Sequence, residues 1–140
     1  MLPRHKWKNQ YQIIEGNSDF HEQVRVILST DPFFSRLRCF QEVHVKDLCP
    51  TYTNSSHRLD WYIEDLGIVI ELHGRQHYEF TNRGSLPFEQ AQREFERAKL
   101  RDIEKKIAIE DQGIVYKEIS YKESAKLSAE RLRELILLKE

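Results

Sequence analysis

Two acidic residues and a histidine near the middle of the chain have the types and spacing of a site that does chemistry. Asp60 interrupts the run RLDWYI, and Glu71 and His73 lie in the run IVIELHG. Carboxylates are ligands that Mg²⁺ prefers, and a histidine beside them can take up or pass on a proton. The three residues together are typical of a hydrolytic site that uses a divalent metal.

The segments that carry these residues have the pattern of a β-hairpin. Residues 58–63 alternate apolar and polar side chains, and residues 68–72, after the turn-like EDLG, form the most β-prone run of the chain. An even-numbered turn places Asp60 opposite Glu71, and His73 then projects from the same face because side chains alternate. The opposite face is predicted to be core and carries Leu59, Trp61, Ile63, Ile68, Ile70 and Leu72.

The facing carboxylates admit two interpretations. Like charges directly across two strands repel each other, and a divalent cation between Asp60 and Glu71 would remove that repulsion. His73 would then be placed to handle an attacking water. Alternatively, antiparallel sheets often expose one polar face, and the three side chains are simply that face. Aspartate is poorly suited to a strand interior, which favours the metal site.

The residues of this hairpin resemble a known family of nucleases. RLDWYI followed by GIVIELHGRQHY resembles the active-site hairpin of the PD-(D/E)XK superfamily, in the branch of very-short-patch repair endonucleases and EDxHD phage homing endonucleases. That branch has a Glu on its first helix, an Asp and an x-His on the hairpin, and an Asp on the next helix. Glu22, Asp60, Leu72–His73 and Asp102 occur in this order. The resemblance covers roughly residues 17–121.

The resemblance implies a metal-dependent endonuclease of the homing or phage type that acts on double-stranded DNA with Mg²⁺ or Mn²⁺. By the same resemblance, the metal ligands are Asp60, Glu71 and the main-chain carbonyl of Leu72. The residues that handle water or protons are His73, Glu22 and Asp102. Very-short-patch enzymes have no acid at the position of Glu71, and their zinc ligands have no counterpart here. Glu71 therefore either binds the metal or assists in another way.

Several of these residues also have an ordinary structural interpretation. With Asp19 as helix N-cap, Glu22 is the third helical residue and suits the reciprocal partner of a capping box. Asp102 is one of many charges on a polar helix, so its context also fits a solvated side chain. Gln76 and His77 resemble a Gly-x-Gln-His element that supports the site in these nucleases by hydrogen bonds.

Basic residues outside the hairpin are candidates for DNA contacts. The run RHKWK near the start is basic and has an indole that can stack on a base or wedge between bases. Many basic residues after the hairpin alternate with glutamates, which also suits pairing along an exposed helix. The predicted contact residues are Arg4, Lys6, Trp7, Lys8, Arg75 and Arg83.

The remaining sequence predicts helices and strands around the hairpin. Besides the hairpin, the predicted elements are an arm at 1–16, a helix from 17–19 to Asp31–Pro32, a strand at 38–46, a helix at 88–111 that ends before Gly113, a strand at 114–120 and an amphipathic helix at 123–139. This order indicates one α/β domain, residues 17–140, with a mixed central sheet flanked by helices. The resemblance implies a restriction-endonuclease-like version of that architecture.

Composition limits the alternatives. At 140 residues with 39% hydrophobic residues, a single domain with a core is expected. No apolar run approaches the ~20 residues that span a bilayer, and no secretory signal is visible, so we expect a cytoplasmic protein with no membrane partner. The net charge of −1 excludes a strongly cationic DNA coat. Cys39 and Cys49 have no zinc-site spacing and are expected to be free thiols.

Other functions and a dimer stay open at this point. A very-short-patch-like or structure-specific repair nickase would use the same site, whereas a catalytically inactive nuclease-fold module would only bind nucleic acid. One site cleaves one strand, so a double-strand break needs two sites or two events. The last predicted helix has apolar residues beyond one face, and either a second subunit or the chain's own sheet buries Leu127, Leu137 and Leu138.

Overall fold

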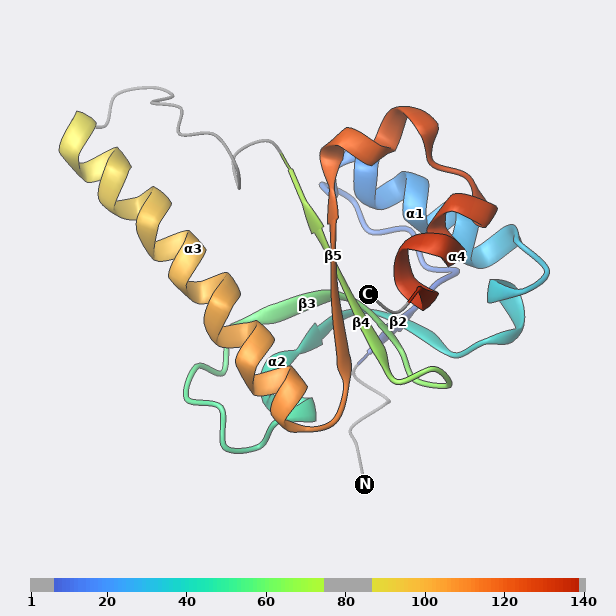
Figure 1. Ribbon diagram of the computed structural model, residues 1–140, viewed down its shortest axis with the longest axis horizontal. Helices are drawn as coiled ribbons and strands as arrows, with labels where there is room; N and C mark the ends of the chain where they lie inside the picture. The colour runs from blue at the N-terminus through green and yellow to red at the C-terminus, as the bar shows by residue number, and fades with distance from the viewer. Residues whose placement is uncertain (1–6, 75–86, 139–140) are drawn as a thin grey trace.

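A five-stranded mixed sheet lies at the centre of the computed structural model, which describes residues 7–74 and 87–138 (Figure 1). In spatial order the strands are β1 (Lys8–Asn9), β2 (Cys39–His44), β3 (Arg58–Ile63), β4 (Ile68–His73) and β5 (Val115–Ser120). The first four pair antiparallel, and β5 pairs parallel with β4 at the edge of the sheet. The predicted α/β class with a mixed sheet is confirmed.

Helices lie on both sides of the sheet (Figure 1). They are α1 (Asp19–Thr30), α2 (Val45–Leu48), α3 (Phe88–Asp111) and α4 (Ala129–Leu137), with 3₁₀ turns η2 (Phe34–Arg36) and η4 (Tyr121–Lys126). On one side are α1 and α4, and on the other are α2 and the C-terminal half of α3, whose N-terminal half extends beyond the sheet. Within the described residues, no helix is both long and apolar enough to cross a membrane.

Each side of the sheet has its own hydrophobic cluster. The α1/α4 core consists of Val24, Leu28, Phe34, Cys39, Trp61, Ile63, Ile68, Ile70, Ile119, Leu132 and Ile136. The α3 core consists of Trp7, Val43, Val45, Leu48, Cys49, Tyr52, Leu59, Tyr62, Val69, Ile109 and Tyr116. The two cysteines are free thiols, as expected.

The predicted apolar face of the hairpin is confirmed with one change. Trp61, Ile63, Ile68 and Ile70 belong to the α1/α4 core, and Leu72 is partly buried against it. Leu59 is the exception. Leu59 pairs with Val43 and packs in the α3 core, because α2 follows β2 directly and covers this end of the sheet. In the turn, Gly67 has φ +64, a left-handed conformation that glycine adopts without a Cβ clash.

Local signals place α1 as predicted but with a different cap. Ser18, not Asp19, is the N-cap, and its hydroxyl accepts a hydrogen bond from the His21 N–H at 3.1 Å. The capping box predicted for Glu22 is therefore wrong, because the register of the cap is one residue earlier. The Glu22 carboxylate instead accepts a hydrogen bond from Arg25 Nε at 2.8 Å.

The predicted arm is part of the fold from Trp7 onward. Trp7 is buried, packs its ring edge-on against Phe40 and Tyr62, and donates its indole N–H to Asp47 at 2.9 Å. The next two residues form β1 and pair with β2. An indole has a large apolar surface and one donor, and both are satisfied here inside the protein. In this structure the indole predicted to stack on DNA is therefore part of the core.

The predicted last helix is two elements in the structure. Residues 121–126 form the 3₁₀ turn η4, and α4 begins after Ser128, whose hydroxyl accepts a hydrogen bond from the Arg131 N–H at 3.1 Å. Serine favours N-caps over helix interiors, which explains the break. Leu127 is partly buried against the α1/α4 core, while Leu137 and Leu138 are exposed.

The long helix α3 has the predicted bounds but turns a different side to the sheet. The sequence predicts that the apolar residues of this helix, Phe95, Ala98, Ile103 and Ile107, face the sheet. In the structure Ile103 and Ile107 are more than half exposed. The positions that turn inward are those of Asp102, Lys105 and the fully buried Ile109, which follow one another at helical spacing. Two of these inward positions are charged, so an apolar stripe was the wrong guide to the side of α3 that faces the sheet.

Candidate active site

Asp60 and Glu71 meet where the pairing of β3 and β4 changes character. The regular register of the two strands continues up to the pair Trp61 and Ile70. Beyond this pair, main-chain N–H groups donate to side-chain carboxylates instead of main-chain carbonyls. The Asp60 N–H donates to Glu71 Oε2 at 2.9 Å, and the Leu72 N–H donates to Asp60 Oδ2 at 2.8 Å. The two carboxyl groups thus lie side by side on one face of the sheet, as the turn length predicts.

Burial makes this carboxyl pair unusual in its protonation. Burial raises the pKa of Asp60. Burial and the neighbouring charge of Asp60 raise the pKa of Glu71 to about 8. Because like charges in a low-dielectric site cannot both ionise cheaply, the pair holds a proton at neutral pH.

Lys105 of α3 supplies a cation beside the pair. Its Nζ lies 2.8 Å from Glu71 Oε1 and donates to the main-chain carbonyl of Arg58, also at 2.8 Å. The Lys105 side chain is mostly buried, with 12% of its surface exposed. Sequence reasoning assigned the neutralising charge to a metal and missed this residue. Its one signal is its position three residues after Asp102, on the same side of the helix.

His73 lies between carboxylates from two other elements. Its Nδ1 is 2.9 Å from Glu118 Oε2 on β5, and its Nε2 is 4.0 Å from Asp102 Oδ2 on α3. The imidazole is buried, with only 5% of its side chain exposed. The structure therefore brings Asp102 close to His73. Glu118 was missed, because no local pattern shows that β5 lies beside β4.

Tyr116 of β5 adds a buried hydroxyl to the same face. Burial raises the pKa of Tyr116, and so do the negative charges of Glu71, Glu118, Asp102 and Asp60. Within the described residues this hydroxyl has no hydrogen-bond partner. The face thus combines buried acids, a histidine, a lysine and a phenol, which can together hold cations and move protons.

The structure does not bring Glu22 to this group. Glu22 belongs to α1, which packs on the opposite face of the sheet, and its carboxylate is paired with Arg25, which lowers the pKa of Glu22. Lys8 is exposed on β1 and lies 3.5 Å from Glu42. The other predicted residues lie outside the described part of the chain: Arg4, Lys6, Arg75, Gln76, His77 and Arg83.

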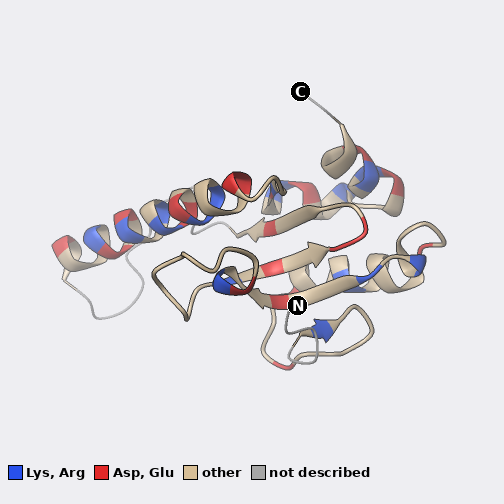
Figure 2. Cartoon of the chain, turned by 90° about the horizontal axis from the view of Figure 1, so that it is seen from below, with Lys and Arg blue, Asp and Glu red and all other residues tan. Residues whose placement is uncertain are grey.

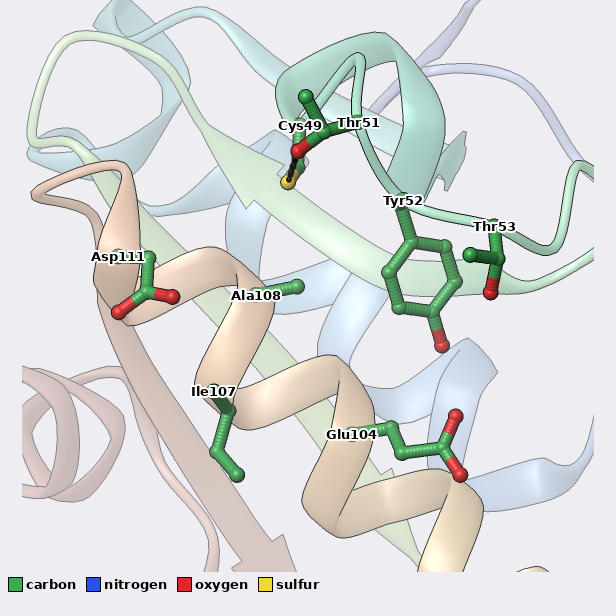
Figure 3. Close-up of a pocket in the computed structure, with 8 residues that line it drawn as sticks. All are labelled: Cys49, Thr51, Tyr52, Thr53, Glu104, Ile107, Ala108 and Asp111. Atoms are coloured by element: carbon green, nitrogen blue, oxygen red, sulfur yellow. Dashed lines mark hydrogen bonds between the residues drawn. The ribbon is translucent and has the colours of Figure 1, made fainter.

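Two surface features lie outside the candidate site. Basic and acidic residues alternate along α3, in agreement with pairing on an exposed helix (Figure 2). A pocket of about 310 Å³ lies between α3 and the segment after α2, where Tyr52, Glu104 and Asp111 are among the lining residues (Figure 3). None of the residues predicted to form the site lines this pocket.

Comparison with protein families, curated proteins and solved structures gives no match. Within the described segments, no group of three or more His, Cys, Asp or Glu side chains has the arrangement of a metal site. Asp60 and Glu71 form a pair, while Asp102 and Glu118 flank His73. This geometry and the hairpin motif are therefore the features of the chain that bear on its function.

Proposed function

We propose that the chain is a metal-dependent DNA endonuclease with a restriction-endonuclease-like fold. The observation that carries the proposal is the pair of partly buried Asp60 and buried Glu71, with His73 on the same face, where β3 and β4 stop pairing regularly. Buried ionisable groups with raised pKa values are costly and gather where chemistry is done. The choice of double-stranded DNA as substrate depends on the hairpin's resemblance to nucleases of the homing or phage type.

The donor atoms at the pair suit a hard divalent cation. Each carboxyl uses one oxygen to accept a main-chain N–H, which holds the group in place, and the second oxygen of Glu71 accepts from Lys105 Nζ. Asp60 and Glu71 would hold Mg²⁺ or Mn²⁺, with the main-chain carbonyl of Leu72 as a further oxygen ligand. A bound metal would supply Lewis-acid stabilisation of a phosphodiester.

The surrounding residues would divide the remaining work. His73 accepts a proton from, or orients, the attacking water, and Asp102 stabilises the charge that the ring then acquires. Lys105 keeps a positive charge beside Glu71, which favours the approach of a phosphate group. Glu22 has no part in this scheme unless α1 changes its position.

Plasmid cleavage with Asp60→Asn tests the proposal. Asparagine can still accept the Leu72 N–H, so the variant removes the charge and keeps the local bond. We expect wild type to cleave in Mg²⁺ and not in EDTA, and Asp60→Asn to be slower by about 100-fold or more, because a metal contributes several kcal/mol to such reactions. Asp111→Asn, on the exposed end of α3, is the matched control. Equal activity of wild type and Asp60→Asn at matched purity would sink the assignment.

A second candidate is a nuclease-fold module that binds nucleic acid without cleaving it. The ammonium of Lys105 already neutralises Glu71, which is the one observation that favours this function. DNA binding that is the same in Mg²⁺ and EDTA, with no cleavage by wild type, would support it. A repair nickase shares the site of the leading proposal, and nicked product without linear product would identify it.

A homodimer also remains a proposal. Most apolar residues of α4 are buried within its own chain. Only the exposed Leu137 and Leu138 at its end support contact with a second subunit. Exposed Leu100, Ile103 and Ile107 on α3 form a second apolar stripe. Sedimentation with and without DNA measures the assembly, and a monomer in both that makes double-strand breaks in one encounter would contradict a dimer.

A further inference from the structure

We infer that Glu118 is a positioning residue that holds the His73 ring with its proton on Nδ1, so that Nε2 is the nitrogen that accepts a proton. The inference rests on the proposed function and deepens it, because it names the ring atom that would act as base. Glu118 belongs to β5, whose place beside β4 is not visible in the sequence motif.

The parallel pairing of β4 and β5 brings the two groups together. Glu71 is level with Glu118, and Leu72 is level with Ile119, so Glu118 projects from the same face as Glu71 and His73. The His73 Nδ1 lies 2.9 Å from Glu118 Oε2, an ordinary distance for an N–H···O hydrogen bond. The imidazole is buried, while 38% of the Glu118 side chain is exposed, so the carboxylate keeps some contact with water.

The chemistry of the two partners decides which ring nitrogen carries the proton. An ionised carboxylate can only accept a hydrogen bond, so Nδ1 must donate. In a neutral imidazole the other nitrogen, Nε2, is then the acceptor. A partner on the opposite side of the ring fixes both the tautomer and the orientation, as in other histidine bases held by a carboxylate.

Asp102 lies on the Nε2 side of the ring and therefore has a different role from Glu118. Its Oδ2 is 4.0 Å from Nε2, which is too long for a hydrogen bond. At that distance its negative charge still favours the imidazolium that forms when Nε2 takes a proton. The two acids thus act on opposite sides of the ring: Glu118 orients the neutral base, and Asp102 stabilises its protonated form.

Nitrogen-15 NMR of histidine side chains tests the tautomer without requiring any cleavage. The His73 signal is assigned by its loss in His73→Asn, and the metal-free protein is titrated until the ring is neutral. We expect the Nδ1–H tautomer in wild type and in Glu118→Gln, whose amide oxygen can still accept, and loss of that preference in Glu118→Ala. An Nε2–H ring in wild type, or an Nδ1–H ring unchanged in Glu118→Ala, would overturn the inference.

Cleavage kinetics then separate a positioning role from a structural one. We expect kcat of Glu118→Ala to fall by about 10-fold to 100-fold with little change in KM, since a general base contributes about 10² to 10⁴. Glu118→Gln should recover part of this rate, and Glu130→Ala, an exposed acid on α4, should match wild type. Wild-type kcat in Glu118→Ala would overturn the positioning role. If wild type itself does not cleave while NMR shows the Nδ1–H ring, the proposed function fails and the tautomer assignment stands.

Discussion

The hairpin buries different kinds of side chain on the two faces of the sheet. On the α1/α4 face the buried side chains from the hairpin are apolar: Trp61, Ile63, Ile68 and Ile70. On the α3 face the same two strands bury Glu71 and His73 and partly bury Asp60, next to Tyr62 and Val69. Burying apolar surface stabilises a fold, whereas burying ionisable groups costs free energy unless partners compensate.

This difference identifies what each face contributes. Both faces have an apolar core that stabilises the fold, but only on the α3 face does that core adjoin ionisable groups from the hairpin. On the α3 face, Lys105 and two main-chain N–H groups offset part of the cost of burying Asp60 and Glu71. A site that depends on such compensation should respond to pH and to single charges, and the apolar face should not.

The largest effect on stability is expected on the apolar face. Ile70 is fully buried, so Ile70→Ala should lower the free energy of unfolding by about 2 to 5 kcal/mol through lost contacts and a cavity. Ile103→Ala, the same change at an exposed position of α3, should alter it by less than about 0.5 kcal/mol. Urea unfolding followed by fluorescence measures both. Similar losses in the two variants would show that the α1/α4 core does not dominate stability.

A smaller effect is expected from removing the cation on the α3 face. Lys105→Met deletes two hydrogen bonds made by a charged donor, which should cost about 1 to 3 kcal/mol of unfolding free energy. The loss should be smaller at pH 6 than at pH 9, because at the lower pH Glu71 is protonated and needs the cation less. Lys106→Met on the exposed side of α3 is the control. A loss that is the same at both pH values would argue against the coupling of Lys105 to Glu71.

A third effect is the pH dependence due to the carboxyl pair. The pKa of Glu71 is raised from its usual 4.5 to about 8, so between these values the folded protein binds more protons than the unfolded chain. Stability from this group is then present in full below pH 4.5 and is lost as pH rises through 8. In EDTA, the free energy of unfolding should therefore fall from pH 6 to pH 9 more steeply in wild type than in Glu71→Gln. Parallel curves for the two proteins would mean that Glu71 has an ordinary pKa.

The hairpin and α3 were predictable because their signals are local. Alternation over 58–63, the turn EDLG and the β-branched run after it determine the register that sets Asp60 beside Glu71. The bounds of α3 were predicted correctly, because helix-forming residues fill it and Gly113 follows it. The break at Ser128 was not predicted. Serine is a common N-cap residue, but the apolar residues on both sides of it have the spacing of one continuous helix.

What the sequence by itself determined is therefore the secondary structure of the hairpin and the pair of acids that it carries. Only the tertiary structure decided which charged residues join that pair. Lys105 and Glu118 come from α3 and β5, and the site holds them because β5 pairs parallel with β4 and α3 turns a partly polar side inward. Likewise, Trp7 is buried because β1 joins the sheet. These outcomes depend on contacts between residues that are far apart in the chain, and local periodicity and capping contain no information about them.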